Sequence, residues 1–168
     1  GSIEYLGEPI NHCPPEYISR KGIIHVLERR QEFRHMTIEE NLRIPAAARR
    51  GTDFRKGLEM SYGYFPLLRP RSTTLAGDCS AGELQMLAIA RALAGKPGLL
   101  LMDDCTSALD AQNGRAFWDE FSEHLPDAAC LIVTHRLATA RQADLIYVIA
   151  EGKVVGSGTH DALLADCP

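Results

Sequence analysis

The spacing of apolar and polar residues predicts short apolar strands that alternate with helices, most regularly in the second half of the chain. We expect strands at residues 2–5, 23–27, 99–102, 129–134, 145–149 and 153–155. We expect helices after Pro14, at residues 38–49, 53–64 and 111–124, behind Ser80, before residue 145 and after Thr159. Alternation of this kind is typical of an α/β fold with a parallel sheet.

Two capping boxes mark predicted helix starts. Thr37 is followed three residues later by Glu40, and Ser80 is followed in the same way by Glu83. In each pair the hydroxyl and the carboxylate can satisfy free backbone N–H groups of the first turn. The helix behind the second box carries Leu84, Leu87 and Ala88 on one apolar face. We expect it to end at Gly95 and Pro97.

The apolar run Leu99 to Met102 leads directly into two carboxylates, Asp103 and Asp104. An unbroken run predicts a fully buried parallel strand, whose carboxyl end lies at the edge where open α/β sheets bind ligands. Carboxylates at this edge suit a nucleotide-bound Mg²⁺, which prefers hard oxygen ligands and often binds through water. Taken alone, the two acids are equally explained as solvated side chains after a buried strand.

Small residues surround the second capping box, at Ser80, Ala81 and Gly82. Small side chains at a helix start let backbone N–H groups approach an anion, and the helix dipole adds attraction for phosphate. In isolation, the same residues are also those of an ordinary N-cap.

The composition is that of an ordinary globular protein, with 45% hydrophobic and 24% charged residues among 168. The formal net charge of −4 disfavours a general nucleic-acid-binding surface. No apolar run reaches the ~20 residues that span a bilayer, and no signal peptide is evident, so a membrane link would require a partner. Five scattered cysteines without a C-x-x-C pair indicate a reduced, cytosolic protein without a zinc site.

The order of these motifs resembles the ATP-binding subunit of ABC transporters, over almost the whole chain. The capped helix CSAGELQMLAIARAL is followed by LLLMDD, then by SALD, and then by the strand LIVTH. The first part, through QEFRHMTIEENL, is most similar to importers of branched-chain amino acids, whereas HRLATARQADLIYVIAEGKVVGSGTHDALLA is more similar to exporter ATPases.

The resemblance implies a P-loop NTPase-like ABC ATPase core with a helical signature subdomain, lacking the amino-terminal strands and the P-loop. Residues 1–28 would form a partial core up to the lid-loop position, and residues 29–95 the helical and signature subdomain. Residues 96–168 would return to the core with the acidic strand, the D-loop and the switch histidine. Strand faces left uncovered would expose apolar side chains and disfavour a stable monomer.

By the same resemblance, four residues form the signature loop, which contacts the γ-phosphate of ATP held by the opposite subunit of a head-to-tail dimer. These residues are Ser80, Ala81, Gly82 and Glu83. The resemblance places Asp103 at the Mg²⁺ position, where it acts through water, and Asp104 at the general-base position.

Three further residues match family positions. Asp110 ends the loop that crosses the dimer interface, and His135 falls on the switch histidine that touches the γ-phosphate. Glu28 falls where most members have the glutamine that links the nucleotide site to the membrane subunit. Ser80, Asp103 and His135 are expected to meet on one nucleotide-facing rim.

The chain also departs from the family pattern. Cys79, Ala81, Asp104 and Cys105 replace the usual leucine, glycine, glutamate and proline. The shorter Asp104 side chain would place its carboxylate short of the attacking water, and an error of about 1 Å can lower a rate ~100-fold. The 168 residues contain no G-x-x-x-x-G-K-[ST] sequence, so we expect this polypeptide alone to bind ATP weakly and to hydrolyse it slowly or not at all.

The expected function is that of an ATP-binding and ATP-hydrolysing subunit, or a fragment of one, that energises transmembrane transport of amino acids. Its expected ligands are ATP and Mg²⁺, and its expected partners a second ATP-binding subunit and a permease, without nucleic acid. The permease would hold it at the cytoplasmic face of the cell membrane.

One alternative is a catalytically degenerate module that supplies a signature face to a partner ATPase. A DNA-repair or chromosome-maintenance ATPase is disfavoured, because the chain has no heptad repeats and an acidic balance.

Overall fold

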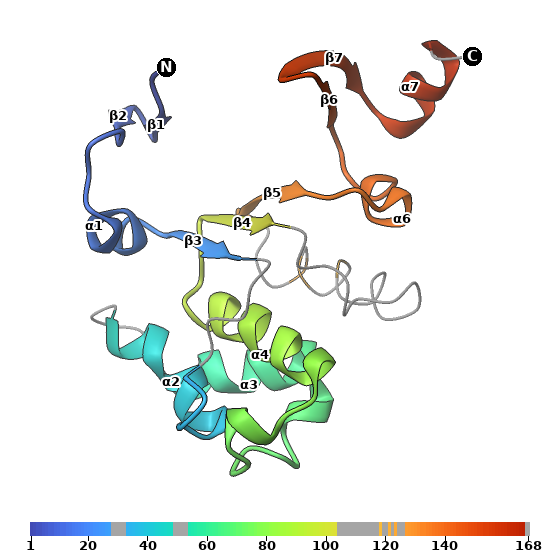
Figure 1. Cartoon of the computed structure of the whole chain (residues 1–168). Coiled ribbons are helices and arrows are strands. Elements are labelled where there is room, and N and C mark those ends of the chain that lie inside the picture. The colour runs from blue at the N-terminus through green and yellow to red at the C-terminus, as the bar shows by residue number, and fades with distance from the viewer. Residues whose placement is uncertain are drawn as a thin grey trace. The chain divides into compact units, whose positions relative to one another are not determined.

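The computed structural model describes residues 1–27, 33–48, 54–103, 118, 121, 123 and 127–166 (Figure 1). Chain contacts divide it into two compact units, Gly1–Ile132 and Val133–Pro168. The predicted Glu28, Asp104 and Asp110 sites lie outside the described residues, as does most of the predicted helix at residues 111–124.

A three-stranded sheet forms the centre of the first unit, in the order β3 (Ile23–Val26), β4 (Leu99–Asp103) and β5 (Ala129–Val133). β3 and β4 are parallel, with Ile23 opposite Leu99 and Val26 opposite Met102. The parallel pairing of strands separated by helices confirms the predicted α/β class.

Helices α2 (Ile38–Ala48), α3 (Phe54–Tyr64) and α4 (Ala81–Ala94) contact one another and gather on one side of this sheet (Figure 1). α4 supplies much of the core, since Leu84, Leu87 and Leu93 are at most 1% exposed. Leu100 and Met102 of β4 belong to the same buried cluster. The predicted apolar face of the helix behind Ser80 is therefore the face that holds α4 within this core.

The prediction that β4 is buried on both faces is wrong. Leu100 and Met102 are buried, but Leu99, Leu101 and Asp103 are only half-buried. The helical cluster covers one face of the strand, and side chains of a strand alternate between the two faces. An apolar run therefore identified the strand correctly, although it could not show that the two faces differ.

Gly95 follows the last residue of α4, as predicted. The structure does not need the left-handed backbone that glycine allows at this position. The φ of Gly95 is −76°, and the left-handed residue at this end is Lys96, with φ 48°. A Cβ on Gly95 would lie 2.7 Å from Ile24 Cδ1 and 3.3 Å from Pro45 Cβ. A glycine here thus lets the end of α4 approach β3 and α2 closely.

The amino-terminal part of the first unit begins with a small hairpin, β1 (Glu4–Tyr5) and β2 (Glu8–Pro9). Its turn places Leu6 and Gly7 at positive φ. Helix α1 (Pro15–Arg20) follows, and Pro at its first position suits a helix start. Short 3-10 turns lie at Pro66–Leu68 and Ala76–Asp78, between α3 and α4.

The second unit contains α6 (Leu137–Ala140), β6 (Ile146–Ala150), β7 (Lys153–Gly158) and α7 (His160–Asp166). β6 and β7 form an antiparallel hairpin around Glu151 and Gly152, which both have positive φ. Thr159 Oγ1 accepts a hydrogen bond from Ala162 N, 3.3 Å away, and confirms the predicted cap of the last helix.

Large apolar side chains are exposed on three of the strands. They are Leu131 and Val133 on β5 and Tyr147, Val148, Ile149, Val154 and Val155 on β6 and β7. Among the residues that the structure describes, no helix is long and apolar enough to cross a membrane.

Candidate functional site

The signature residues form the amino-terminal end of α4. Ser80 is its N-cap, with Oγ accepting from Glu83 N at 3.3 Å, while Ser80 N donates to Glu83 Oε2 at 2.7 Å. These reciprocal bonds confirm the predicted capping box. They hold the exposed Ser80 beside the free N–H groups of the first helical turn, where an anion is stabilised.

The position of Gly82 is open in the structure. A Cβ built there would meet no atom of the other described residues within 4 Å, its own helix backbone aside, and the backbone is not left-handed. Neither packing nor backbone conformation therefore requires glycine at this position. Ala81 next to it is exposed, so its methyl group lies at the surface over which an anion would have to approach.

Glu83 is held from two sides. One carboxylate oxygen accepts from Ser80 N, and the other forms an ion pair with Arg71 Nη1. The backbone N–H of Ser80, the Ser80 hydroxyl and the Arg71 guanidinium together hold the pKa of the Glu83 carboxyl below its usual value of 4.5. At neutral pH, Glu83 is therefore ionised, and its carboxylate holds the start of α4 in place.

This lowered pKa predicts an acid-sensitive helix cap. A depressed carboxyl pKa stabilises the fold above the unfolded value of about 4.5, and the stabilisation is lost as pH falls through the folded value. We expect Glu83→Gln to lower the free energy of unfolding by less than about 1 kcal/mol at pH 7, and by still less at pH 3. Urea titrations of both proteins at the two pH values measure this difference, and an equal difference at both would contradict it.

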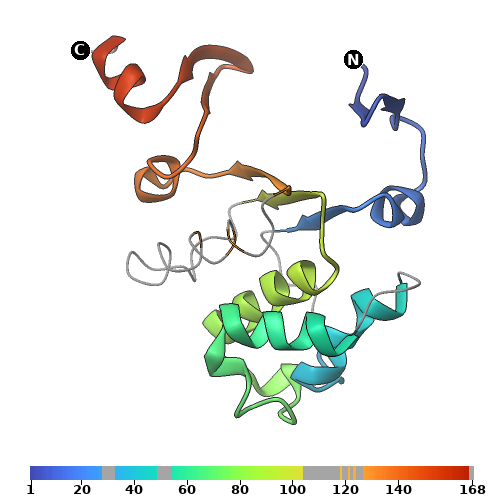
Figure 2. The same ribbon diagram turned by 180° about the vertical axis from the view of Figure 1, so that it is seen from behind.

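Asp103 is the last residue of β4 and is half-buried. In both views, α4 and β4 run in opposite directions (Figures 1 and 2). The amino-terminal end of α4 and the carboxyl end of β4 therefore lie toward the same side of the first unit. The structure thus brings the signature loop and the predicted Mg²⁺ position to one side of this unit. No group of three acidic, His or Cys side chains suited to a metal occurs among the described residues.

His135 follows the end of β5 and is exposed within the second unit. Thr134 Oγ1 accepts from Arg136 N at 3.1 Å, which shapes the chain on both sides of this histidine. Ser80 and Asp103 belong to the first unit, so the expected meeting of His135 with them stays a prediction.

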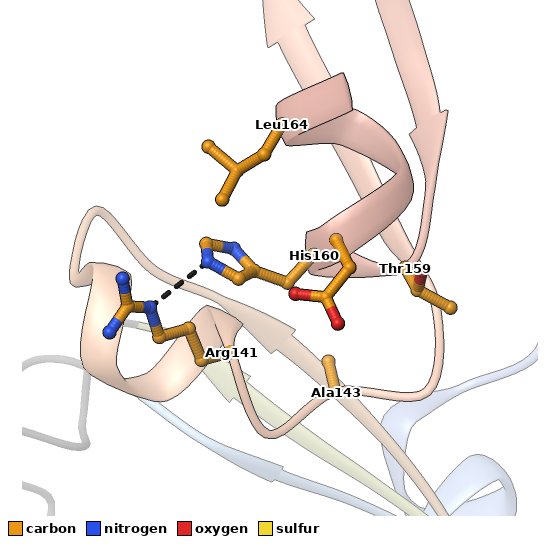
Figure 3. Close-up of a pocket in the computed structure, with 6 residues that line it drawn as sticks. Arg141, Ala143, Thr159, His160 and Leu164 are labelled. Atoms are coloured by element: carbon orange, nitrogen blue, oxygen red, sulfur yellow. Dashed lines mark hydrogen bonds between the residues drawn. The ribbon is translucent and has the colours of Figure 1, made fainter. Parts of the chain in front are cut away.

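A separate open pocket lies within the second unit (Figure 3). Arg141 and His160 point toward one another, and Arg141 Nε donates to His160 Nε2 at 3.0 Å. Leu164 and Ala143 add apolar surface to its lining. Both residues lie in the segment that resembles exporter ATPases, but the resemblance assigned neither of them a role, so sequence reasoning gave no reason to select this pocket.

Sequence reasoning also missed two side chains that shape the first unit, Asn41 and Arg71. Asn41 is fully buried in α2, and Arg71 lies in the loop before α4. Asn41 contacts residues four to eight positions away, and Arg71 contacts Glu83 twelve positions away. Their spacing matches no local motif, which left no signal in the sequence.

The first unit combines an open, capped helix start with a parallel strand that ends in an aspartate. These features define a class of α/β proteins suited to phosphate binding. The family model described as ABC transporter matches residues 1–107. The chain belongs to the ABC transporter family.

Known proteins agree with this assignment. BraG, a high-affinity branched-chain amino acid transport ATP-binding protein of Pseudomonas aeruginosa, is 33% identical over 99% of this chain and 72% of its own length. An uncharacterized ABC transporter ATP-binding protein of Mycobacterium tuberculosis is 44% identical over 53% of this chain, but the match spans only 15% of that protein. The structure of a bacterial Atm1-family ABC exporter with ATP bound superposes with a TM-score of 0.85 at 25% identity, over 100% of this chain and 30% of that one.

Proposed function

We propose that the chain is an ATP-binding subunit, or part of one, of a transporter that uses ATP to move amino acids across a membrane. The observation that carries this proposal is the open and capped start of α4, where Ser80 is exposed and Gly82 leaves free space. Family membership supports the nucleotide, and the likeness to BraG supports the choice of amino acids.

In this proposal the α4 end binds the γ-phosphate of ATP that a second ATP-binding subunit holds. The Ser80 hydroxyl and the N–H groups beside Gly82 donate to the phosphate oxygens, and their fixed geometry lowers the cost of developing charge. Asp103 holds Mg²⁺ through water, because its carboxylate supplies the hard oxygen that this ion prefers. Mg²⁺ supplies charge neutralisation of the phosphates when bound.

The remaining roles rest on the family resemblance. Asp104 orients the attacking water as general base, and His135 stabilises the γ-phosphate. Asp110 lies at the dimer interface, and Glu28 links the site to a permease that contacts residues 29–78. The division into residues 1–28, 29–95 and 96–168 belongs to the same proposal, as does a location at the cytoplasmic face of the membrane.

Adding a subunit with a complete G-x-x-x-x-G-K-[ST] loop tests the function. We expect ATPase activity above the sum of the two proteins, and a ~10-fold loss when Ser80→Ala removes the hydroxyl. Thr37→Ala is the matched control, since Thr37 Oγ1 caps α2 by accepting from Glu40 N at 3.2 Å. Both variants lose a cap worth about 1 kcal/mol, but only the first is expected to lower activity. Equal losses in both variants would contradict the proposal.

A second candidate is a module that supplies only the signature face to a partner ATPase. The observation that favours it is Asp104, whose side chain is one methylene shorter than the glutamate usual at this position. The same mixing assay separates the two candidates. Loss of activity in both Ser80→Ala and Asp104→Asn supports a hydrolysing subunit, whereas loss in Ser80→Ala alone supports the module.

A further inference from the structure

The loop of residues 69–77 joins the amino-terminal ends of two helices. On one side, its carbonyl oxygens receive the first N–H groups of α2: Ile38 N donates to Thr74 O and Glu39 N to Ser72 O, both at 3.0 Å. The first N–H groups of a helix have no partner within the helix, so these bonds satisfy groups that would otherwise need water or a side chain. The loop therefore caps α2 directly.

The same loop is paired with the segment before α2. Ala76 N donates to Met36 O and Gly77 N to Arg34 O, each at 2.9 Å, and Thr37 and Leu75 form an antiparallel bridge. A Cβ on Gly77 would lie 3.1 Å from Arg34 O, so the two backbones approach closely there. The loop is thus anchored along most of its length before it reaches Ser80.

Arg71 connects this anchored loop to the signature residues. Its backbone is fixed on both sides, because Arg71 N donates to Leu68 O at 3.2 Å and Thr74 N donates to Arg71 O at 2.8 Å. Leu68 is fully buried in the core. From this base the Arg71 guanidinium forms its ion pair with Glu83, whose side chain is only 18% exposed.

We propose that Arg71 is a positioning residue for the signature loop. Arg71 fixes one carboxylate oxygen of Glu83, and the other oxygen then holds the backbone N–H of Ser80. The direction of the Ser80 hydroxyl is set through this chain of contacts, and Arg71 itself touches no phosphate. The inference rests on the proposed function for its effect on ATPase activity, while its structural part concerns this chain alone.

A comparison with the neighbouring arginine supports this role. Arg69 lies in the same loop and forms an ion pair with Glu59, but those side chains are 56% and 64% exposed. Within the described residues, the polar partner of the Arg69 guanidinium is Glu59, and its ring contact is Tyr62. Exposed pairs of that kind contribute little to stability. The Arg71 pair differs because its carboxylate partner is also bonded to the backbone of the functional residue.

Hydrogen exchange at the Ser80 amide tests the positioning role. In Arg71→Met we expect this amide to exchange ~10-fold faster, because its acceptor Glu83 is no longer held from the other side. Arg69→Met is the control, expected to leave the exchange unchanged, and Arg71→Lys is expected to restore part of the protection. Exchange of buried core amides such as Leu87 reports that each variant is folded. An unchanged Ser80 amide in folded Arg71→Met would overturn the proposal.

Activity in the mixed assay with a P-loop-bearing subunit provides the second readout. We expect Arg71→Met to lower kcat severalfold while KM for ATP stays within twofold, since the partner holds most of the nucleotide. Two results together would contradict the proposed function while leaving the positioning role intact. They are faster exchange at the Ser80 amide in Arg71→Met, and ATPase activity that is unchanged by Ser80→Ala. Faster exchange with unchanged kcat in an assay that does respond to Ser80→Ala would overturn the functional part of this inference.

Discussion

Replacing Asn41 with alanine is expected to lower the free energy of unfolding by about 3 kcal/mol. The Asn41 side chain is fully buried and forms four hydrogen bonds with the segment before α2. Its Oδ1 accepts from Phe33 N at 3.0 Å, and its Nδ2 donates to Phe33 O at 3.0 Å and Thr37 O at 2.9 Å. Loss of this amide leaves Phe33 N without its acceptor and removes one of the two hydrogen bonds at each carbonyl oxygen of Phe33, Met36 and Thr37. Each lost hydrogen bond costs about 1 kcal/mol, and the truncation also empties a fully buried position.

Asn11 provides a matched control for this prediction. Its amide also bonds two backbone groups, Ile3 N at 2.8 Å and Gly1 O at 3.0 Å, but it does so at the surface. Water can replace those bonds, so Asn11→Ala is expected to change stability by no more than ~0.5 kcal/mol. Urea unfolding followed by circular dichroism measures both variants. Similar losses in the two would show that burial of the Asn41 network is not the cause.

The Asn41 network also shows where sequence reasoning reaches its limit. The capping boxes at Thr37 and Ser80 were predictable, because their partners lie three residues away and the chemistry is complete within one turn. The Asn41 side chain also bonds backbone groups, but those groups reach it because the segment before α2 folds back onto the helix. Only the structure shows this arrangement. An asparagine within a predicted helix gives no sign of such a contact.

Burial was the second property that the sequence could not supply. The short apolar run Leu99 to Met102 identified β4, and the alternation of strands with helices predicted its parallel pairing. Which face of the strand is covered depends on where α4 lies, and that placement requires the whole unit. In the same way, the glycine that ends α4 was recognised from the sequence, but its close approach to Ile24 was not.

The candidate site was predictable in part for a related reason. Ser80 to Glu83 form one continuous segment, so a motif could identify them and their local geometry together. The support beneath them comes from Arg71 in another segment, and a one-segment motif does not record it. A substitution in this support would leave every signature residue in place while it changes how they are held.

Gly82→Ala is expected to lower ATPase activity in the mixed assay ~100-fold without destabilising the chain. Apart from its two neighbours and its own helix backbone, a Cβ at this position meets no atom within 4 Å in the part of the chain that the structure describes, and alanine is a better helix former than glycine. Among the described residues the new methyl displaces no group, so an effect on activity would come from a group that approaches the start of α4 from outside. If that group is the γ-phosphate held by a partner, its displacement moves the phosphate away from the N–H groups that stabilise it.

Gly57→Ala is the control with the opposite expected pattern. Its Cβ would lie 3.1 Å from Ala94 O at the crossing of α3 and α4, so we expect a loss of about 1–3 kcal/mol in stability. Activity per folded molecule should stay unchanged, because this crossing contributes no residue to the signature loop. Thermal unfolding and single-concentration ATPase assays distinguish the two variants. Normal activity in a folded Gly82→Ala protein would show that no phosphate approaches this helix end, because the space required for that approach would then be filled without consequence.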